Sequence, residues 1–212
     1  MMRLVLLMGL LVSLSACASG PKVPPRPQLP YDSWYVALAA PRFMEVWVEG
    51  VDVLDQRRLA FYRVTGGVAS YTRQPEGWHK GGGGGMPMNN VDLPVELFLR
   101  WQSLVEPQTY KIGIKIPQRV RDEMVRPERV FCQGSRKWKH DYRDTITLGM
   151  APGGIVKVWF GGPCLDFREV GRFQAEIEPL GPYRGGSEGQ YVTIEPENKA
   201  YVEKHGIPYG SW

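Results

Sequence analysis

Residues 144–160 read Asp-Thr-Ile-Thr-Leu-Gly-Met-Ala-Pro-Gly-Gly-Ile-Val-Lys-Val-Trp-Phe, and this stretch indicates the fold of the chain. Two runs rich in β-branched and apolar residues, 145–150 and 155–160, flank the segment Pro152–Gly154. Proline restricts φ to about −65° and glycine accepts positive φ, so the two runs are predicted to be strands joined by a tight turn. The stretch is therefore a folding signal first and a functional one second.

Working outward, the same strand pattern recurs at intervals separated by Gly/Pro turns. Within residues 109–116, apolar side chains at 110, 112, 114 and 116 alternate with Lys111, Gly113 and Lys115. Short helices are predicted at 118–125, after Pro117, and at 197–205, before Gly206. Further strands are predicted at residues 34–39, 43–53, 58–65, 96–102, 168–177 and 190–194. The fold class is predicted to be all-β, mainly antiparallel and sandwich or barrel-like, with one or two short helices.

The first residues have the organisation of an export signal. Residues 1–16 begin with Met-Met-Arg and continue with an apolar run at 4–14, shorter than the roughly 20 residues that a transmembrane helix needs. Residues 14–17, Leu-Ser-Ala-Cys, resemble the bacterial lipobox. This resemblance implies that Cys17 becomes the first mature residue and carries acyl chains such as palmitate. Ala18 resembles the signal for sorting to the outer membrane, which implies a lipid anchor on its periplasmic face.

A proline-rich tether is predicted to follow, because residues 18–30 contain five prolines and favour an extended chain. At about 3.1 Å per residue, such a segment would hold a domain roughly 40 Å from the membrane. The predicted organisation is thus a signal peptide at 1–16, a lipidated tether at 17–30 and a single β-rich domain at 31–212.

Two cysteines, Cys132 and Cys164, remain once Cys17 is assigned to lipid. An even pair in an exported chain favours a disulfide, and two buried free thiols are the alternative. A metal site is not expected, since the cysteines and the three scattered histidines lack ligand spacing.

Basic residues gather between Arg119 and Arg143, where eight Lys/Arg face four Asp/Glu. The segment is interpreted either as a patch for an acidic partner or anionic headgroups, or as a solvated loop. The net charge of +4 for the whole chain is too small to indicate nucleic-acid binding. Tryptophans in predicted strands (Trp47, Trp101, Trp159) are assigned to the core. The partner-binding candidates are the loop tryptophans with adjacent basic residues: Trp78, Arg136, Lys137, Trp138 and Lys139.

Catalytic chemistry has no local signature in the chain. The glycines at 81–85 are not followed by a helix, so they are interpreted as a connector and not as a phosphate loop. Ser135 and Ser187 do not lie in a nucleophile elbow, and Glu176 and Glu178 are interpreted as acids on a solvated strand face. No catalytic residue, cofactor or enzymatic activity is therefore predicted.

Two blocks resemble a family of uncharacterised proteobacterial lipoproteins, the domain of unknown function 2931. These are residues 92–103, Asp-Leu-Pro-Val-Glu-Leu-Phe-Leu-Arg-Trp-Gln-Ser, and residues 148–159, with Ala-Pro-Gly-Gly as the most specific part. The resemblance covers residues 30–175 and implies a cellular location and a β-rich fold but no activity. Members are similar to small lipoproteins encoded beside type VI secretion phospholipase effectors.

The functional hypothesis is a lipid-anchored, periplasm-facing binding protein with a protein partner and a membrane contact through its N-terminal lipid. Immunity against a secreted toxin, such as a type VI lipase effector, is the preferred role. The alternative is a structural or envelope-maintenance lipoprotein that binds cell-wall glycan.

Overall fold

A computed structural model describes residues 24–78 and 85–212. The predicted signal peptide, Cys17, the first part of the predicted tether and most of the glycine run lie outside these residues. In the described part, no helix combines the length and the apolar composition needed to cross a membrane.

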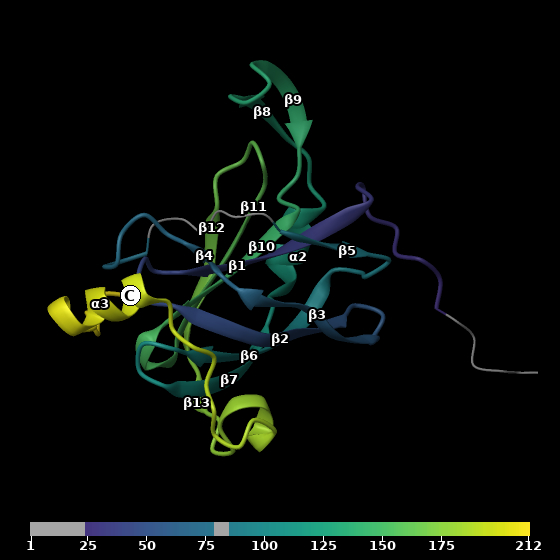
Figure 1. Cartoon of the computed structure of the whole chain (residues 1–212). Coiled ribbons are helices and arrows are strands. Elements are labelled where there is room, and N and C mark those ends of the chain that lie inside the picture. The colour runs from purple at the N-terminus through teal and green to yellow at the C-terminus, as the bar shows by residue number, and fades with distance from the viewer. Residues whose placement is uncertain (1–23, 79–84) are drawn as a thin grey trace, which may run out of the picture.

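Two packed β-sheets form the body of the molecule, as the alternating sequence patterns predict (Figure 1). Sheet A has the order β12 (Arg168–Gln174), β11 (Ile155–Gly161), β10 (Thr145–Ala151), β1 (Ser33–Ala40) and β4 (Ser70–Tyr71), with β5 (Met86–Asn89) also paired to β1. Sheet B has the order β13 (Glu176–Ile177), β7 (Gln108–Lys115), β6 (Pro94–Ser103), β2 (Val46–Asp55) and β3 (Ala60–Val68). The all-β prediction is confirmed, and the two sheets are open.

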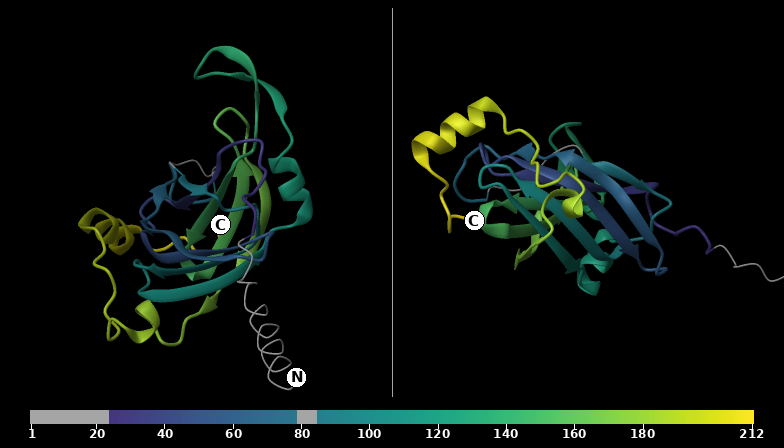
Figure 2. Two further views of the ribbon diagram at one scale, coloured as in Figure 1. Left: turned by 90° about the vertical axis from the view of Figure 1, so that its right-hand side faces the viewer. Right: turned by 60° about the horizontal axis from the view of Figure 1, so that its bottom comes forward.

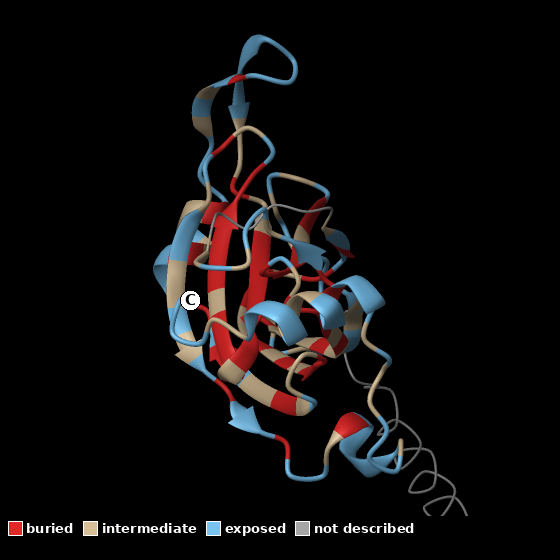
Figure 3. Cartoon of the chain, turned by 60° about the vertical axis from the view of Figure 1, so that its left-hand side comes forward, coloured by how far each residue is buried: buried red, intermediate tan, exposed pale blue. Residues whose placement is uncertain are grey.

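The core lies between the sheets: β1, β10 and β11 of sheet A are buried along most of their length, the long red strands of Figure 3, whereas β2 of sheet B buries mainly one face. On β2, for example, Val46, Val48, Val51 and Val53 are all at most 2% exposed. Burying each such side chain contributes about 1.5–3 kcal/mol. The same alternation turns the polar residues of sheet B outward, and this outer face is where a candidate ligand site is described below.

The turn at η1 (Pro152–Gly154) joins β10 to β11 as predicted. Gly153 and Gly154 have φ values of 77° and 73°, in the left-handed region that favours glycine. At Gly154 a Cβ would also lie 2.8 Å from the Tyr110 ring. Glycine is therefore required at Gly154 for both conformation and space.

Two pairings in sheet A are parallel, those of β1 with β10 and with β4. β1 pairs with β10 in parallel, starting at Tyr35 opposite Thr145. The two strands consequently begin at the same end of the sandwich. There, the Tyr31 ring contacts the Tyr142 ring edge-on, with centroids 5.4 Å apart.

The end of the predicted tether lies against the domain. Leu29 packs on the core, and an Arg57 guanidinium nitrogen donates to the Pro25 carbonyl at 3.0 Å. Residues 25–29 therefore lie against the domain and not free of it.

Both predicted helices are present, as α2 (Gln118–Met124) and α3 (Pro196–His205). The predicted strand at 190–194 is wrong, because these residues form no strand. They belong to a C-terminal strap, residues 178–198, that crosses the outer face of sheet B (Figure 2). Polar side chains hold it there: Gln102 accepts from the Val192 N–H at 2.9 Å, and Glu45 accepts from the Asn198 amide at 2.7 Å.

Candidate functional site

A β-hairpin, β8 (Glu128–Cys132) and β9 (Lys137–Asp141), stands out from the sandwich as a separate two-stranded sheet (Figure 1). Its surface is mostly exposed (Figure 3). The four-residue turn ends at Arg136, whose φ is 53°. A two-stranded hairpin alone is marginally stable in water, so this one depends on the contacts at its root.

One face of the hairpin is aromatic and cationic. The register places Phe131 opposite Trp138 and Arg129 opposite His140. The rings of Phe131 and Trp138 meet edge-on at 5.8 Å, and the Arg129 guanidinium lies 4.8 Å from the Trp138 ring centre. Trp138 remains 62% exposed, which leaves a large amphipathic surface available for contact.

The opposite face carries Lys137 and Lys139, with Arg136 at the turn. Four lysines and arginines lie between Glu128 and Asp141, and both of these acids have cationic partners. Asp141 pairs with Lys139 at 3.2 Å, and Glu128 pairs with Arg143 at 2.8 Å. The tip of the hairpin is therefore positively charged on both sides.

Arg143 fastens the root of the hairpin. Its side chain is only 1% exposed and bonds Glu128 of β8 and Asp166 of the β11–β12 loop, at 2.8 and 2.9 Å. A second arginine, Arg168, bonds Glu123 of α2 and also Glu128, at 2.7 and 3.3 Å. These charge-assisted bonds connect the hairpin, α2 and the β11–β12 loop in one network.

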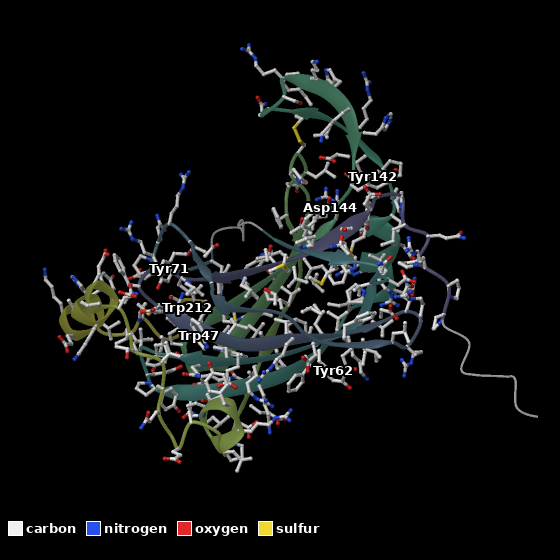
Figure 4. The ribbon with its side chains drawn as sticks, turned by 45° about the vertical axis from the view of Figure 1, so that its right-hand side comes forward. Trp47, Tyr62, Tyr71, Tyr142, Asp144 and Trp212 are labelled. Carbon is white, nitrogen blue, oxygen red and sulfur yellow. A yellow bond between two sulfur atoms is a disulfide. The ribbon has the colours of Figure 1, made fainter. Side chains whose placement is uncertain are left out.

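The ionisable groups at the root of the hairpin have shifted pKa values. Burial alone would lower the pKa of Arg143, but its hydrogen bonds to Glu128 and Asp166 raise it. The same bond from Arg143 lowers the pKa of Asp166 below its usual 3.8. Nearby Asp144 shows the opposite sign, since desolvation raises its pKa. Asp144 and Tyr142 lie where the hairpin joins the sandwich (Figure 4).

A disulfide between Cys132 and Cys164 is the second fastening. Cys132 ends β8, and Cys164 lies in the loop between β11 and β12. The predicted pairing is confirmed. It anchors the outer part of the hairpin to a loop of sheet A, 32 residues further along the chain.

The family described as "Protein of unknown function (DUF2931)" matches residues 19–210. The chain belongs to the DUF2931 family. No curated protein and no solved structure is significantly similar to it. The match includes the tail after residue 180, which the resembling blocks did not reach. It begins after Cys17, so lipidation of that cysteine stays a prediction.

The candidate residues of this DUF2931 protein fall in two places. Arg136, Lys137, Trp138 and Lys139 share the hairpin, with Trp138 facing away from the two lysines. Trp78 does not join them: it packs against Trp159 of sheet A at 5.2 Å, in a second apolar cluster.

Two contact residues, Arg129 and Phe131, were missed by sequence reasoning. The signal that identifies them is a weak alternation in residues 128–132 and 137–141 around the Gln-Gly-Ser-Arg turn. In the part of this DUF2931 chain that the structure describes, no group of three or more His, Cys, Asp or Glu side chains is placed to hold a metal ion.

Proposed function

We propose that the chain is an exported, lipid-tethered binding protein whose β8–β9 hairpin docks into an acidic concavity of a protein partner. The observation that carries the proposal is the projecting hairpin, with its exposed Trp138 and its cationic tip, fastened at the root. Immunity against a secreted toxin, such as a type VI lipase effector, is the role that fits a hairpin that fills and blocks a site.

The physical argument is preorganisation. The hairpin adds little to the core, yet a disulfide and a buried arginine hold it in one conformation. A binding element that is already ordered avoids the conformational-entropy cost that a flexible loop incurs on association. The fastening therefore supports a role for the hairpin in binding rather than in folding.

The chemistry of the hairpin indicates its partner. An exposed tryptophan beside an arginine has the composition of a binding hot spot, and it fits an apolar pocket. Lysines and arginines around it favour a rim of carboxylates and accelerate encounter at low salt. A narrow projection is complementary to a concave surface, as an enzyme's substrate cleft provides.

The experiment uses the full chain in detergent micelles as bait for the native envelope and for products of neighbouring genes. A stoichiometric toxin-like partner, with its activity inhibited on binding, supports the proposal. Retention on peptidoglycan or on anionic vesicles, without a protein partner, would replace it with an envelope-structural role or with headgroup binding.

Charge reversal on the hairpin is expected to weaken partner binding about 100-fold or more. Three replacements, Arg136, Lys137 and Lys139 to Glu, turn attraction to an acidic rim into repulsion, at about 1 kcal/mol or more for each site. The change is measured by calorimetry against the captured partner. The control replaces three exposed lysines elsewhere, Lys115, Lys199 and Lys204, and changes net charge equally. Equal losses in both variants would contradict docking through the hairpin.

Anchoring has its own test, because residues 17 and 18 lie outside the described structure. Ala18→Asp is expected to keep the protein in the inner-membrane fraction, and Cys17→Ser to leave it without lipid. Membrane fractionation after labelling with a radioactive fatty acid measures both. An Ala18→Asp protein that still reached the outer membrane would refute the sorting argument.

A further inference from the structure

A cleft of about 270 Å³ opens on the outer face of sheet B, away from the hairpin. Strands β2, β3 and β6 form its floor, and η2 (Pro182–Gly185) of the C-terminal strap forms one wall. The cleft therefore exists only when the strap is in place. Nothing in the proposed docking of the hairpin uses it.

Three arginines line this cleft: Arg63, Arg100 and Arg184. Arg63 and Arg184 are exposed and form no salt bridge within the described residues. Arg100 is 13% exposed and lies 3.4 Å from Glu178, and its buried Nε has no hydrogen-bond partner in the described part of the chain. Two carboxylates, Glu49 and Asp52, also line the cleft, so the lining residues together carry a net charge of +1.

Two carboxylates hold the backbone at Arg63 and next to Arg184. Asp52 accepts a hydrogen bond from the Arg63 N–H, and Glu49 accepts one from the Tyr183 N–H, each at 2.8 Å. Arg63, Tyr183 and Arg184 all have positive φ, between 51° and 56°. Left-handed backbone is costly for such residues, and it gathers at functional sites.

Space for Arg63 comes from a glycine. A Cβ at Gly50 would lie 3.1 Å from Cγ of Arg63, so the arginine crosses β2 where there is no side chain. The position of the Arg63 side chain in the cleft thus depends on the backbone conformation at Arg63 and on the glycine at position 50.

Aromatic rings complete the cleft. Tyr62 is 77% exposed, Phe98 lies 5.5 Å from the Arg100 guanidinium, and Tyr183 is 38% exposed. The Tyr183 hydroxyl accepts from the Trp47 indole at 2.7 Å, which fixes that ring. Trp47 and Tyr62 both lie along the lower sheet in Figure 4. Flat apolar ring faces suit the C–H face of a sugar ring, as they suit other partly apolar surfaces.

We propose that this cleft binds one unit of a saccharide that carries a carboxylate. Guanidinium groups recognise a carboxylate through paired hydrogen bonds, aromatic rings cover the sugar face, and the remaining oxygens of Asp52 and Glu49 accept from hydroxyls. The volume lies just below the usual range for small-ligand pockets, about 300–1,000 Å³, and suits a single sugar unit.

The test compares three probes by calorimetry on the full chain in detergent micelles. N-acetylmuramic acid has a sugar ring and a lactyl carboxylate, N-acetylglucosamine has the ring alone, and D-lactate has the carboxylate alone. We expect N-acetylmuramic acid to bind about tenfold more tightly than either of the others, as a charge-assisted contact to a bound ligand predicts. Equal binding of D-lactate would reduce the cleft to an adventitious anion site.

A matched pair of variants locates the binding. Arg184→Gln is expected to weaken binding of N-acetylmuramic acid about tenfold and to leave N-acetylglucosamine unchanged. Arg119→Gln, an exposed arginine of α2, is the control and should change neither affinity. No binding of N-acetylmuramic acid up to about 10 mM, or an Arg184→Gln protein that binds it normally, would overturn the proposal. The hairpin charge-reversal variant should bind the sugar normally, so this test is independent of the docking proposal.

Discussion

Replacing both Cys132 and Cys164 by alanine is expected to lower the free energy of unfolding by about 3–4 kcal/mol. The disulfide closes a loop of 32 residues' separation, and its loss restores that loop's freedom to the unfolded chain. Because the hairpin has no core beneath it, its amide hydrogens should also exchange with solvent much faster. Urea unfolding and hydrogen exchange measure the two effects.

Reduction of the wild-type protein supplies the control for this variant. A reducing agent should lower wild-type stability by a similar amount and leave the double-alanine protein unchanged. If the free energy of unfolding of the variant falls by less than about 1 kcal/mol, the disulfide does not stabilise the protein by restricting the unfolded chain, contrary to the chain-entropy argument. Alanine is preferred to serine because Cys132 is 8% exposed and a hydroxyl there would lack a partner.

Arg143→Met is expected to cost about 2–3 kcal/mol. Methionine keeps the apolar length of the side chain but leaves Glu128 and Asp166 without their cation. The loss stays below the value for a fully buried pair because these carboxylates are 30% and 61% exposed and are partly solvated. Arg119→Met, whose arginine is 57% exposed, should change stability by no more than about 0.5 kcal/mol.

The loss of stability in the Arg143→Met variant is expected to depend on pH. The folded-state pKa of Asp166 is lowered by Arg143, so its stabilising contribution is fully present above the usual value of 3.8. That contribution disappears as the pH falls through the lowered folded-state pKa. The stability difference between wild type and Arg143→Met should therefore narrow at acid pH. A constant difference from pH 7 to about pH 2 would show that Arg143 acts by packing alone.

Much of the sandwich could be predicted from sequence, because strands of sheet B such as β2 alternate and strands β1, β10 and β11 of sheet A are short apolar runs. The alternation at Tyr110, Ile112 and Ile114 and the turn at Pro152–Gly154 each carry a local signal for their structure. The predicted strand at 190–194 carries a similar signal and is not a strand, because distant polar side chains such as Gln102 bind its backbone N–H groups. The strand pattern around Trp47 predicts a core position, whereas its side chain lies on the outer face beside Tyr183.

The candidate sites were predictable only in part. The basic residues between Arg136 and Lys139 can be recognised from the sequence, and they lie together on the hairpin. Arg129 and Phe131 join Trp138 through the register of two mostly exposed strands, and the alternation within these strands is too weak to predict that pairing by itself. The cleft brings Arg63 together with Arg184, which lie far apart in the chain. No local sequence pattern predicts that these two arginines lie close together.

The parallel pairing of β1 with β10 has a mechanical consequence. The N-terminal segment and the hairpin root leave the sandwich from the same end of these two neighbouring strands, at Tyr35 and Thr145. Tension between an anchored N-terminus and a partner that grips the hairpin would act on this end alone. The ladder would then peel open one bond at a time, whereas loading from opposite ends would shear all its bonds together. The Cys132–Cys164 bridge transfers part of such a pull to β11, so two strands of sheet A share the load.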